Sequence, residues 1–538
     1  MTLRRLLLIS SLLLVVSALC EVASPTHFDG KTWWDYVKVL AADNMMGRET
    51  GSKELQTAEA YVVTQLKQAG LQPAGTDGYY QRVKFTARQI VEKDSSLVLV
   101  RDGKNQPLTL GEDAFFSSRV DLAPSVEAPL AFVGWGLDVP EQNYNDLAGI
   151  DLHGKIAVLI NGSPSELPGA LAAHYQSSAE RWKALRKAGA IGIIGIPNPA
   201  SMDIPWSRLS LNRNHVTMTL DYPQFNDTEG EQLYVTFNPE RADQLFAGSG
   251  HSWQEIVDAA KERKQLPRFP LAVSVKATTK LEKHPVDSAN IVAKLAGNDP
   301  ELKNEYVVLS AHIDHIGVGE AVNGDRIYNG AMDNASGSAV LLDVASSLHK
   351  SQDKPKRSVL FLFVTAEEKG LLGSRYFTAY PTVDRKAMVA DINTDMFLPL
   401  IPLHRLTVLG LAESDLGDDA REVAEARGIQ VQADPQPQRN VFIRSDQYNF
   451  IRHGIPALMM DVAPDPNSPE QKQLYKDWLT HRYHAPSDDL DQPVDLSAAA
   501  QYEEVVRALM IRVADSSQRP QWKSDSFFRR YEETPSQY

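Results

Sequence analysis

The stretch FLFVTAEEKGLLGS, residues 361–374, decides how the middle of this chain folds. Its first five residues form an apolar, strand-forming run that leads into two adjacent glutamates, Glu367 and Glu368. Two carboxylates at the end of a buried strand repel each other, and burying either one costs several kcal/mol unless it is paired or binds a metal. If only one apolar run ended in charged side chains, a strand that simply reaches solvent would explain it. Three apolar runs in this chain end in charged or imidazole side chains.

Three apolar runs end in residues that can bind metals. They are YVVLSAHIDH at 306–315, SVLFLFVTAEE at 358–368 and MVADINTDMF at 388–397. Such near-continuous apolar runs are typical of strands that are buried on both faces of a parallel sheet. Segments with helical spacing lie between them, at 335–350 and 371–380. This order of strands and helices predicts an α/β fold with a doubly wound, mostly parallel sheet.

The polar residues that follow these runs should share one edge of the sheet, because ligands bind outside the carboxyl ends of such strands. A further apolar run, Ala457–Val462, is predicted to be a fourth strand. Two imidazoles and four carboxylates come together in this way: His312, Asp333, Glu367, Glu368, Asp395 and His484. Zinc takes this mixture of nitrogen and oxygen ligands. Two ions about 3.5–4 Å apart need one bridging carboxylate, and one of the adjacent glutamates can bind metal while its neighbour acts as a base.

Five motifs occur in order along the chain: HIDH (312–315), NGAMDNASG (329–337), TAEEKGLLGS (365–374), NTDM (393–396) and YHAPSDD (483–489). Each motif is weak by itself, but five in this order at strand ends are a specific signal. Together they resemble the two-zinc aminopeptidase family, whose clan also contains glutamate carboxypeptidase-like enzymes and glutaminyl cyclases. The motifs and their flanks place this resemblance in residues 30–120 and 270–515.

The resemblance implies a role for each matching residue. One zinc ion would take His312 and Asp395, the other Glu368 and His484, with Asp333 bridging the two. The general base would be Glu367. The carboxylate that orients the first histidine would be Asp314.

Three further positions in or next to these motifs are a second histidine near each predicted histidine ligand and the residue before Asp333. Spacing alone does not separate His484 from His481, and it is the family pattern that selects His484. His315 is expected to be structural or to support a ligand. Met332 stands where the family often has an aspartate, but that aspartate is not a ligand in the family pattern.

The chemistry implied by these motifs is metal-assisted hydrolysis of an amide bond, with peptides as substrates. An aminopeptidase must hold an ammonium group, and Glu367, Asp446 and Asp488 are acids in the motif segments that could lie near it. A carboxypeptidase needs clustered cations for a terminal carboxylate, and the arginines at 375, 444 and 482 form no cluster in sequence. The sequence therefore favours an aminopeptidase. A carboxypeptidase or dipeptidase, a glutaminyl cyclase, a non-catalytic binding relative and a two-metal phosphatase are the alternatives.

Four regions are expected along the chain. Residues 1–23 are predicted to be a signal peptide, 24–125 and 267–520 a zinc peptidase domain, 126–266 an insertion and 521–538 a polar tail. The insertion is predicted to be mainly β-structure, with glycine punctuation between short apolar runs. It resembles a protease-associated domain through GKIAVLINGS (154–163) and KALRKAGAIGIIG (183–195).

Composition and the first residues restrict the partners and the location. The net charge of −14 and the absence of a basic block argue against nucleic acid as a partner. The first twenty residues, MTLRRLLLISSLLLVVSALC, have two arginines before an apolar run that is short for a membrane span. Export to the periplasm or the medium is therefore expected, with no transmembrane span in the mature chain. Lipid anchoring at Cys20, the single cysteine, is the alternative. The sequence does not indicate an oligomeric state.

Overall fold

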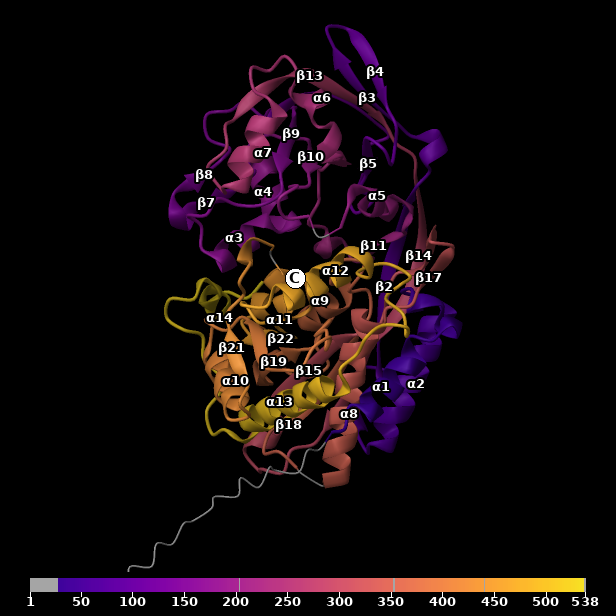
Figure 1. Cartoon of the computed structure of the whole chain (residues 1–538), viewed down its shortest axis with the longest axis vertical. Helices are drawn as coiled ribbons and strands as arrows, with labels where there is room; N and C mark the ends of the chain where they lie inside the picture. Colours follow the sequence, from indigo (N-terminus) through magenta and orange to yellow (C-terminus); the bar gives the residue numbers. More distant parts are fainter. Residues whose placement is uncertain (1–27, 203, 352–353, 440, 537–538) are drawn as a thin grey trace, which may run out of the picture.

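The computed structural model describes residues 28–202, 204–351, 354–439 and 441–536, which form two lobes (Figure 1). The lower lobe in Figure 1 holds the first sheet and most of the helices, and the upper lobe holds the second sheet. The predicted signal peptide and Cys20 lie outside the described residues and stay predictions. No helix in the described part of the chain combines the length and the apolar character that a membrane crossing requires.

The first sheet has the order β11-β2-β14-β18-β15-β19-β22-β20-β21, with β1 paired to β14. Its central strands β18, β15, β19 and β22 are parallel, and antiparallel pairs flank them. The α/β fold with a parallel sheet at its centre is thereby confirmed. The strands are β1 Gln72–Pro73, β2 Tyr80–Ile90, β11 Thr217–Leu220, β14 Leu281–Leu295, β15 Tyr306–His312, β18 Ser358–Val364, β19 Met388–Asn393, β20 Arg405–Leu409, β21 Gln430–Gln432 and β22 Ala457–Val462.

Helices cover both faces of this sheet, which explains why its central strands are apolar without alternation. Along β15, Val307 and Leu309 belong to the core that includes α1, α2, α8 and α13, whereas Val308 packs with α9 and α11 on the opposite face. The helices of this lobe are α1 Lys31–Leu40, α2 Lys53–Gln68, α8 Ser336–Ser351, α9 Leu372–Ala379, α10 Asp415–Glu425, α11 Gln447–Arg452, α12 Pro469–His481, α13 Leu496–Asp515 and α14 Arg530–Glu533.

The second sheet has the order β4-β3-β13-β6-β9-β10-β12-β5 and its own hydrophobic core. Its strands are β3 Ser96–Arg101, β4 Lys104–Leu108, β5 Ala114–Phe116, β6 Ser125–Phe132, β9 Ile156–Ile160, β10 Gly192–Ile196, β12 Leu233–Phe237 and β13 Phe269–Thr278. The helices beside it are α3 Gly169–Gln176, α4 Ser178–Lys187, α5 Trp206–Leu209, α6 Asp243–Phe246 and α7 Trp253–Lys261. Two short hairpins, β7 Asp138–Val139 with β8 Tyr144–Asn145 and β16 Gly317–Val322 with β17 Asp325–Tyr328, stand apart from both sheets.

The second sheet extends beyond the predicted insertion of residues 126–266. Strands β3, β4 and β5 precede that range and β13 follows it, yet all four pair within the second sheet. Conversely, β11 lies inside the range but pairs with β2 of the first sheet. The sequence does not show which sheet a strand joins, because pairing depends on which strand edges meet in space. Strands with alternating polar and apolar residues look alike in sequence whichever sheet they belong to. The resemblance of this region to a protease-associated domain stays a prediction.

Residues 521–536 are packed against both lobes, although the composition of this segment predicts a polar tail. Trp522 and Phe528 are buried, and Trp522 donates from its indole nitrogen to the carbonyl of Gly454 at 2.9 Å. The ring of Phe527 lies 5.0 Å from that of His174 in the second lobe. A few aromatic side chains in a polar segment are therefore enough to fix it to the surface.

The central strand β18 should carry a large share of the stability of the first lobe. Phe361 is fully buried there, so Phe361→Ala removes a ring from a closed core and should lower the free energy of unfolding by about 3–5 kcal/mol. Val318 is 41% exposed, and Val318→Ala should change it by about 0.5 kcal/mol or less. Urea denaturation followed by far-UV circular dichroism measures both. Equal losses in the two variants would contradict this description of the core.

Candidate metal centre

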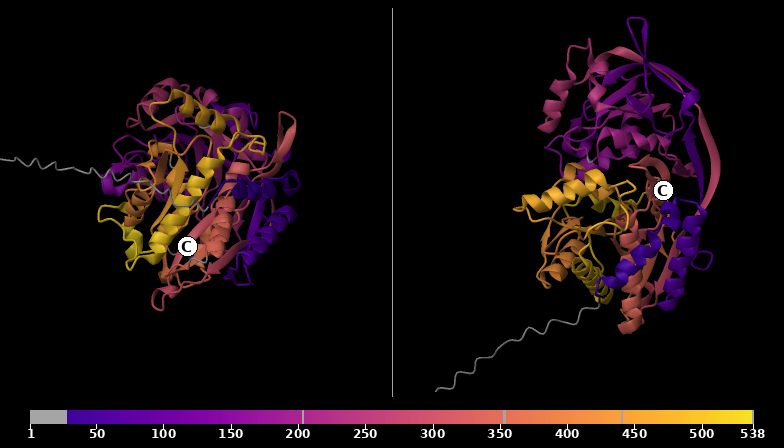
Figure 2. Two further views of the ribbon diagram at one scale, coloured as in Figure 1. Left: turned by 60° about the horizontal axis from the view of Figure 1, so that its bottom comes forward. Right: turned by 45° about the vertical axis from the view of Figure 1, so that its right-hand side comes forward.

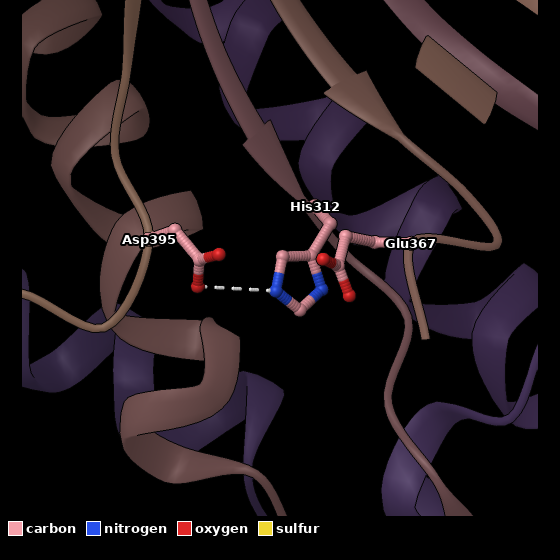
Figure 3. A group of neighbouring side chains, drawn as sticks. All are labelled: His312, Glu367 and Asp395. Atoms are coloured by element: carbon pink, nitrogen blue, oxygen red, sulfur yellow. Dashed lines mark hydrogen bonds and ion pairs between the residues drawn. The ribbon is translucent and has the colours of Figure 1, made fainter. Parts of the chain in front are cut away.

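The predicted ligands meet at the carboxyl ends of the parallel strands. His312 is the last residue of β15, which lies between β18 and β19. Glu367 and Glu368 follow β18, and Asp395 follows β19, so three parallel strands deliver four side chains to one edge. Figure 3 shows Glu367 and Asp395 on either side of the His312 ring, with Oδ1 of Asp395 3.3 Å from Nε2 of the histidine.

Asp333 lies between the two predicted histidine ligands. Its Oδ1 is 3.3 Å from Nε2 of His312, and its Oδ2 is 3.1 Å from Nε2 of His484. The same Nε2 of His484 lies 3.3 Å from Oε2 of Glu368. One carboxylate thus presents one oxygen to each half of the site, as a bridging ligand must.

The donor atoms gather in two groups that could each hold a metal ion. One contains His312, Glu367 and Asp395, and the other contains His315, Asp333 and Glu368, with all donor atoms of a group within 4.8 Å of one another. The seven predicted residues lie near one another, but the first group includes Glu367, the predicted base, and the second includes His315 instead of His484. Nδ1 of His315, which was expected to be structural or supporting, lies 2.7 Å from Oε1 of Glu368.

The chemistry of this donor set fits divalent cations. Several carboxylates are buried together, and carboxylates without compensating charge are strongly destabilising in the interior. Burial alone would raise the pKa of Asp333, but hydrogen bonds from His312 and His484 lower it well below its usual range. The two histidines therefore favour the ionised form of Asp333, which is the form that binds cations.

Glu367 has a different electrostatic environment from its neighbour. Burial raises the pKa of Glu367 well above its usual range, and the charges of Glu368, Asp395 and Asp446 raise it further, against the effect of His312. For Glu368, burial is outweighed by His484 and His315, and the pKa is lowered. Burial and neighbouring charges therefore favour the protonated form of Glu367 and the ionised form of Glu368.

Asp314 ties the first histidine to the glutamate pair. Its main-chain carbonyl lies 3.1 Å from Nδ1 of His312, so the main chain orients the imidazole more closely than the carboxylate, whose Oδ1 is 3.9 Å away. The carboxylate instead accepts from the main-chain amide of Glu367 at 3.1 Å and from the hydroxyl of Thr50 at 2.9 Å. Asp314 therefore positions both His312 and Glu367.

A buried arginine, Arg48, holds the ligand-bearing loops together. Its guanidinium donates to the carbonyls of Ile313, Asn329 and Gly330 at 3.0, 2.7 and 2.9 Å. Burial lowers its pKa to about 10, against the attraction of nearby acids such as Asp488. The local sequence around Arg48, GRETGS at 47–52, gives no sign of this role, because a local pattern does not show where a side chain donates in space.

Asp488 also has a positioning role rather than the amine-binding role suggested by its place near the motifs. It is fully buried, and its oxygens accept from the main-chain amides of Met332 and Asp333 at 2.9 and 3.0 Å. Gln492 donates to the same carboxylate at 2.8 Å. These bonds leave Asp488 inaccessible to a substrate amine and fix the loop that carries Asp333.

The second lobe reaches the site at two points that sequence patterns did not reveal. Arg119 follows β5 and donates to the main-chain carbonyl of Glu368 at 3.1 Å. Arg208 in α5 donates to the main-chain carbonyls of Thr480 and Tyr483, next to His484. Single arginines between strands of another sheet carry no signal of such contacts in the sequence.

Residues 290–510 match the model of peptidase family M28, and this range includes all seven predicted site residues. This segment of the chain is therefore similar to peptidase family M28. Two curated relatives with similar segments are a probable leucine aminopeptidase 2 of Aspergillus fumigatus and aminopeptidase Y of Saccharomyces cerevisiae. The first is 27% identical over 217 residues, 37% of this chain and 39% of the relative. The second is 25% identical over 210 residues, 38% of this chain and 35% of the relative.

The matched segments therefore span about two fifths or less of these curated relatives. Among solved structures, an aminopeptidase from Aneurinibacillus sp. strain AM-1 is similar over 91% of this chain and 95% of its own, with a TM-score of 0.54 and 19% identity. This likeness extends through both lobes and concerns the fold. The M28 match is confined to the first lobe, where the site residues lie.

The two adjacent glutamates of the site should differ in their effect on metal binding. The wild-type chain is expected to hold two metal equivalents after dialysis. Glu368→Gln replaces a charged ligand by a neutral amide, so it should lose one equivalent, whereas Glu367→Gln should keep both. Elemental analysis by mass spectrometry measures the content. Loss of metal from Glu367→Gln would assign that residue to the ligands of the first group instead.

Proposed function

We propose that this protein is a zinc-dependent aminopeptidase that hydrolyses the N-terminal peptide bond of its substrates. The observation that carries the proposal is the position of Asp333, with one oxygen facing His312 and the other facing His484. This arrangement suits two ions with a shared ligand. The M28 match over residues 290–510 supports a peptidase, and zinc is the ion that imidazole and carboxylate ligands favour here.

The reaction requires a base beside the scissile bond, and Glu367 is suited to that task. Zinc held by these ligands would supply a Lewis acid that polarises the carbonyl and lowers the pKa of the attacking water. Glu367 takes a proton from that water while the water oxygen bonds to the carbonyl carbon. It then passes the proton to the leaving nitrogen as the C–N bond breaks. Glu367 must be ionised to accept that proton, and bound cations would favour its ionised form against the burial that raises its pKa.

Amine capture is supported by the partners of the arginines near the site. Arg375 pairs with Asp227 at 2.6 Å, Arg482 lies 3.7 Å from Asp489, and Arg444 donates to the hydroxyl of Tyr483 at 3.3 Å. These three guanidinium groups are engaged with other groups and do not converge on one point. Asp446 and Asp395 also lie near Glu367, but Asp446 is fully buried and Asp395 is a candidate ligand, so the support comes from the arginines.

A carboxypeptidase or dipeptidase is the second candidate, and Arg119 is the observation that favours it. Its guanidinium approaches the site from the second lobe and donates to the carbonyl of Glu368. A second donor pair of the same guanidinium could receive a substrate carboxylate, because arginine offers five N–H groups in one plane. The two candidates differ in which end of the substrate must be charged.

Glu367→Gln should lower kcat by about 10²–10⁴-fold, because the amide retains the shape of the side chain but cannot accept the proton. KM should change little, since the substitution leaves the surroundings of the substrate intact. Steady-state hydrolysis of an aminoacyl p-nitroanilide measures both constants. The matched control is Glu49→Gln, which alters a glutamate that pairs with Lys369 at 3.1 Å and should affect kcat much less. Full activity in Glu367→Gln would overturn the mechanism.

Two blocked peptides decide the direction of cleavage. N-acetylation removes the charge of the amine and should abolish hydrolysis, whereas C-amidation of the same peptide should alter the rate by less than about threefold, since an aminopeptidase makes no charged contact with the far end. Product analysis by mass spectrometry follows both reactions. The opposite pattern, together with loss of activity in Arg119→Ala, would show a carboxypeptidase.

A further inference from the structure

His484 is the predicted ligand with the least support from the first sheet. It follows α12 rather than a strand, and its main chain has a φ of 52°, which residues other than glycine seldom adopt. Its side chain is 23% exposed, whereas the side chains of His312, Asp333, Glu368 and Asp395 are 1–11% exposed. A ligand in a left-handed turn at the surface needs a further contact to keep its orientation.

Arg208 supplies such a contact from the second lobe. Its guanidinium donates to the carbonyl of Thr480, in the last turn of α12, and to the carbonyl of Tyr483, the residue before His484. Carbonyls in the last turn of a helix lack partners within the helix, and a cation at that end is favoured by the helix dipole. The planar guanidinium joins two carbonyls on either side of the turn and fixes their relative position.

Arg208 is itself held by the second sheet. In the same short helix, Trp206 donates to the carbonyl of Gly111 at 3.0 Å, and its ring lies 5.6 Å from that of Phe115 in β5. Strand β5 pairs with β12 in the second sheet. A continuous series of contacts therefore leads from the second sheet through α5 to the turn that carries His484.

The ring of His484 depends on this turn for its direction. Tyr483 stacks on His484 with ring centroids 3.9 Å apart, and the main-chain amide of Tyr483 donates to Trp478 at 3.2 Å. The two carbonyls held by Arg208 lie on both sides of this amide. Release of the carbonyls would let the turn and the stacked pair rotate together, which would withdraw Nε2 of His484 from Asp333 and Glu368.

We propose that Arg208 is a positioning residue of the metal centre, through which the second lobe holds His484 in its ligating orientation. The inference rests on the proposed function in that it takes His484 to be a ligand of the second ion. This ion is then bound at full affinity only when Arg208 of the second lobe is hydrogen-bonded to the end of α12. The second lobe is then a structural part of the metal centre.

The test is zinc titration of the metal-free full-length chain in competition with a chromogenic chelator. Arg208→Ala should lower the affinity for one of the two ions by about 10–100-fold, the range found when a group that orients a ligand is removed. The affinity for the other ion should stay within about twofold of the wild-type value. Arg208→Met keeps the apolar stem of the side chain and should give the same result even if Arg208→Ala folds poorly. Arg208→Lys retains a cation at the helix end and should restore part of the affinity.

A double variant separates positioning from general destabilisation. In a His484→Ala background the second ion has already lost its ligand, so Arg208→Ala should change the affinity of the remaining ion by less than about twofold. Arg186→Ala is the matched control, since Arg186 is an exposed arginine of the same lobe that pairs with Glu229 at 2.9 Å. It should bind both ions like the wild type.

Two outcomes would overturn the inference. One is unchanged affinity for both ions in Arg208→Ala and Arg208→Met. The other is that Arg208→Ala lowers zinc affinity equally in the wild-type and His484→Ala backgrounds, which would show that the arginine acts on the fold as a whole. The proposed function is tested separately, because a wild-type chain that binds two ions yet cleaves no peptide would refute the peptidase and leave the result for Arg208 standing.

Discussion

The burial of Asp333 between two imidazoles is the interaction on which the rest of the site depends. Both of its oxygens are engaged, one with His312 and one with His484, so a small displacement of Asp333 would disturb both halves at once. Asp333 also lies among other buried carboxylates whose repulsion must be offset by histidines and cations. The surrounding structure is therefore organised to hold one loop, residues 330–335, in place.

That loop is held by two buried charged side chains of opposite sign. Asp488 accepts from the amides of Met332 and Asp333, and Arg48 donates to the carbonyls of Asn329 and Gly330 just before them. Hydrogen bonds to charged groups are stronger than neutral ones, and a buried charge without partners is costly, so these contacts favour a single arrangement. Arg48 also reaches the carbonyl of Ile313 and thereby connects the Asp333 loop to the end of β15.

The second lobe takes part in the site by main-chain contacts rather than by donor groups for a metal. Arg119 reaches the carbonyl of Glu368, and Arg208 reaches the turn before His484. Both arginines leave the ligand side chains free and act on the chain that carries them. Phe527 and Arg530 of the C-terminal segment contact His174 and Glu141, so the two lobes are joined at more than one place. Figure 2 shows the same two lobes from other directions, with β14 running alongside both.

The amino-acid sequence by itself determined the central sheet and the order of its ligands. Apolar runs such as 306–312 and 358–364 can be buried only between two layers of helices, and the polar residues after them then fall at one edge whatever the details of packing. The grouping of His312, Asp333 and Glu368 followed from that rule. Only the tertiary structure decided which sheet the strands of residues 96–116 join, that Trp522 and Phe528 fix the end of the chain, and that Arg48, Arg119 and Arg208 support the site. These features depend on contacts between segments far apart in the chain, which have no repeating pattern along the sequence and arise only when the folded surfaces meet.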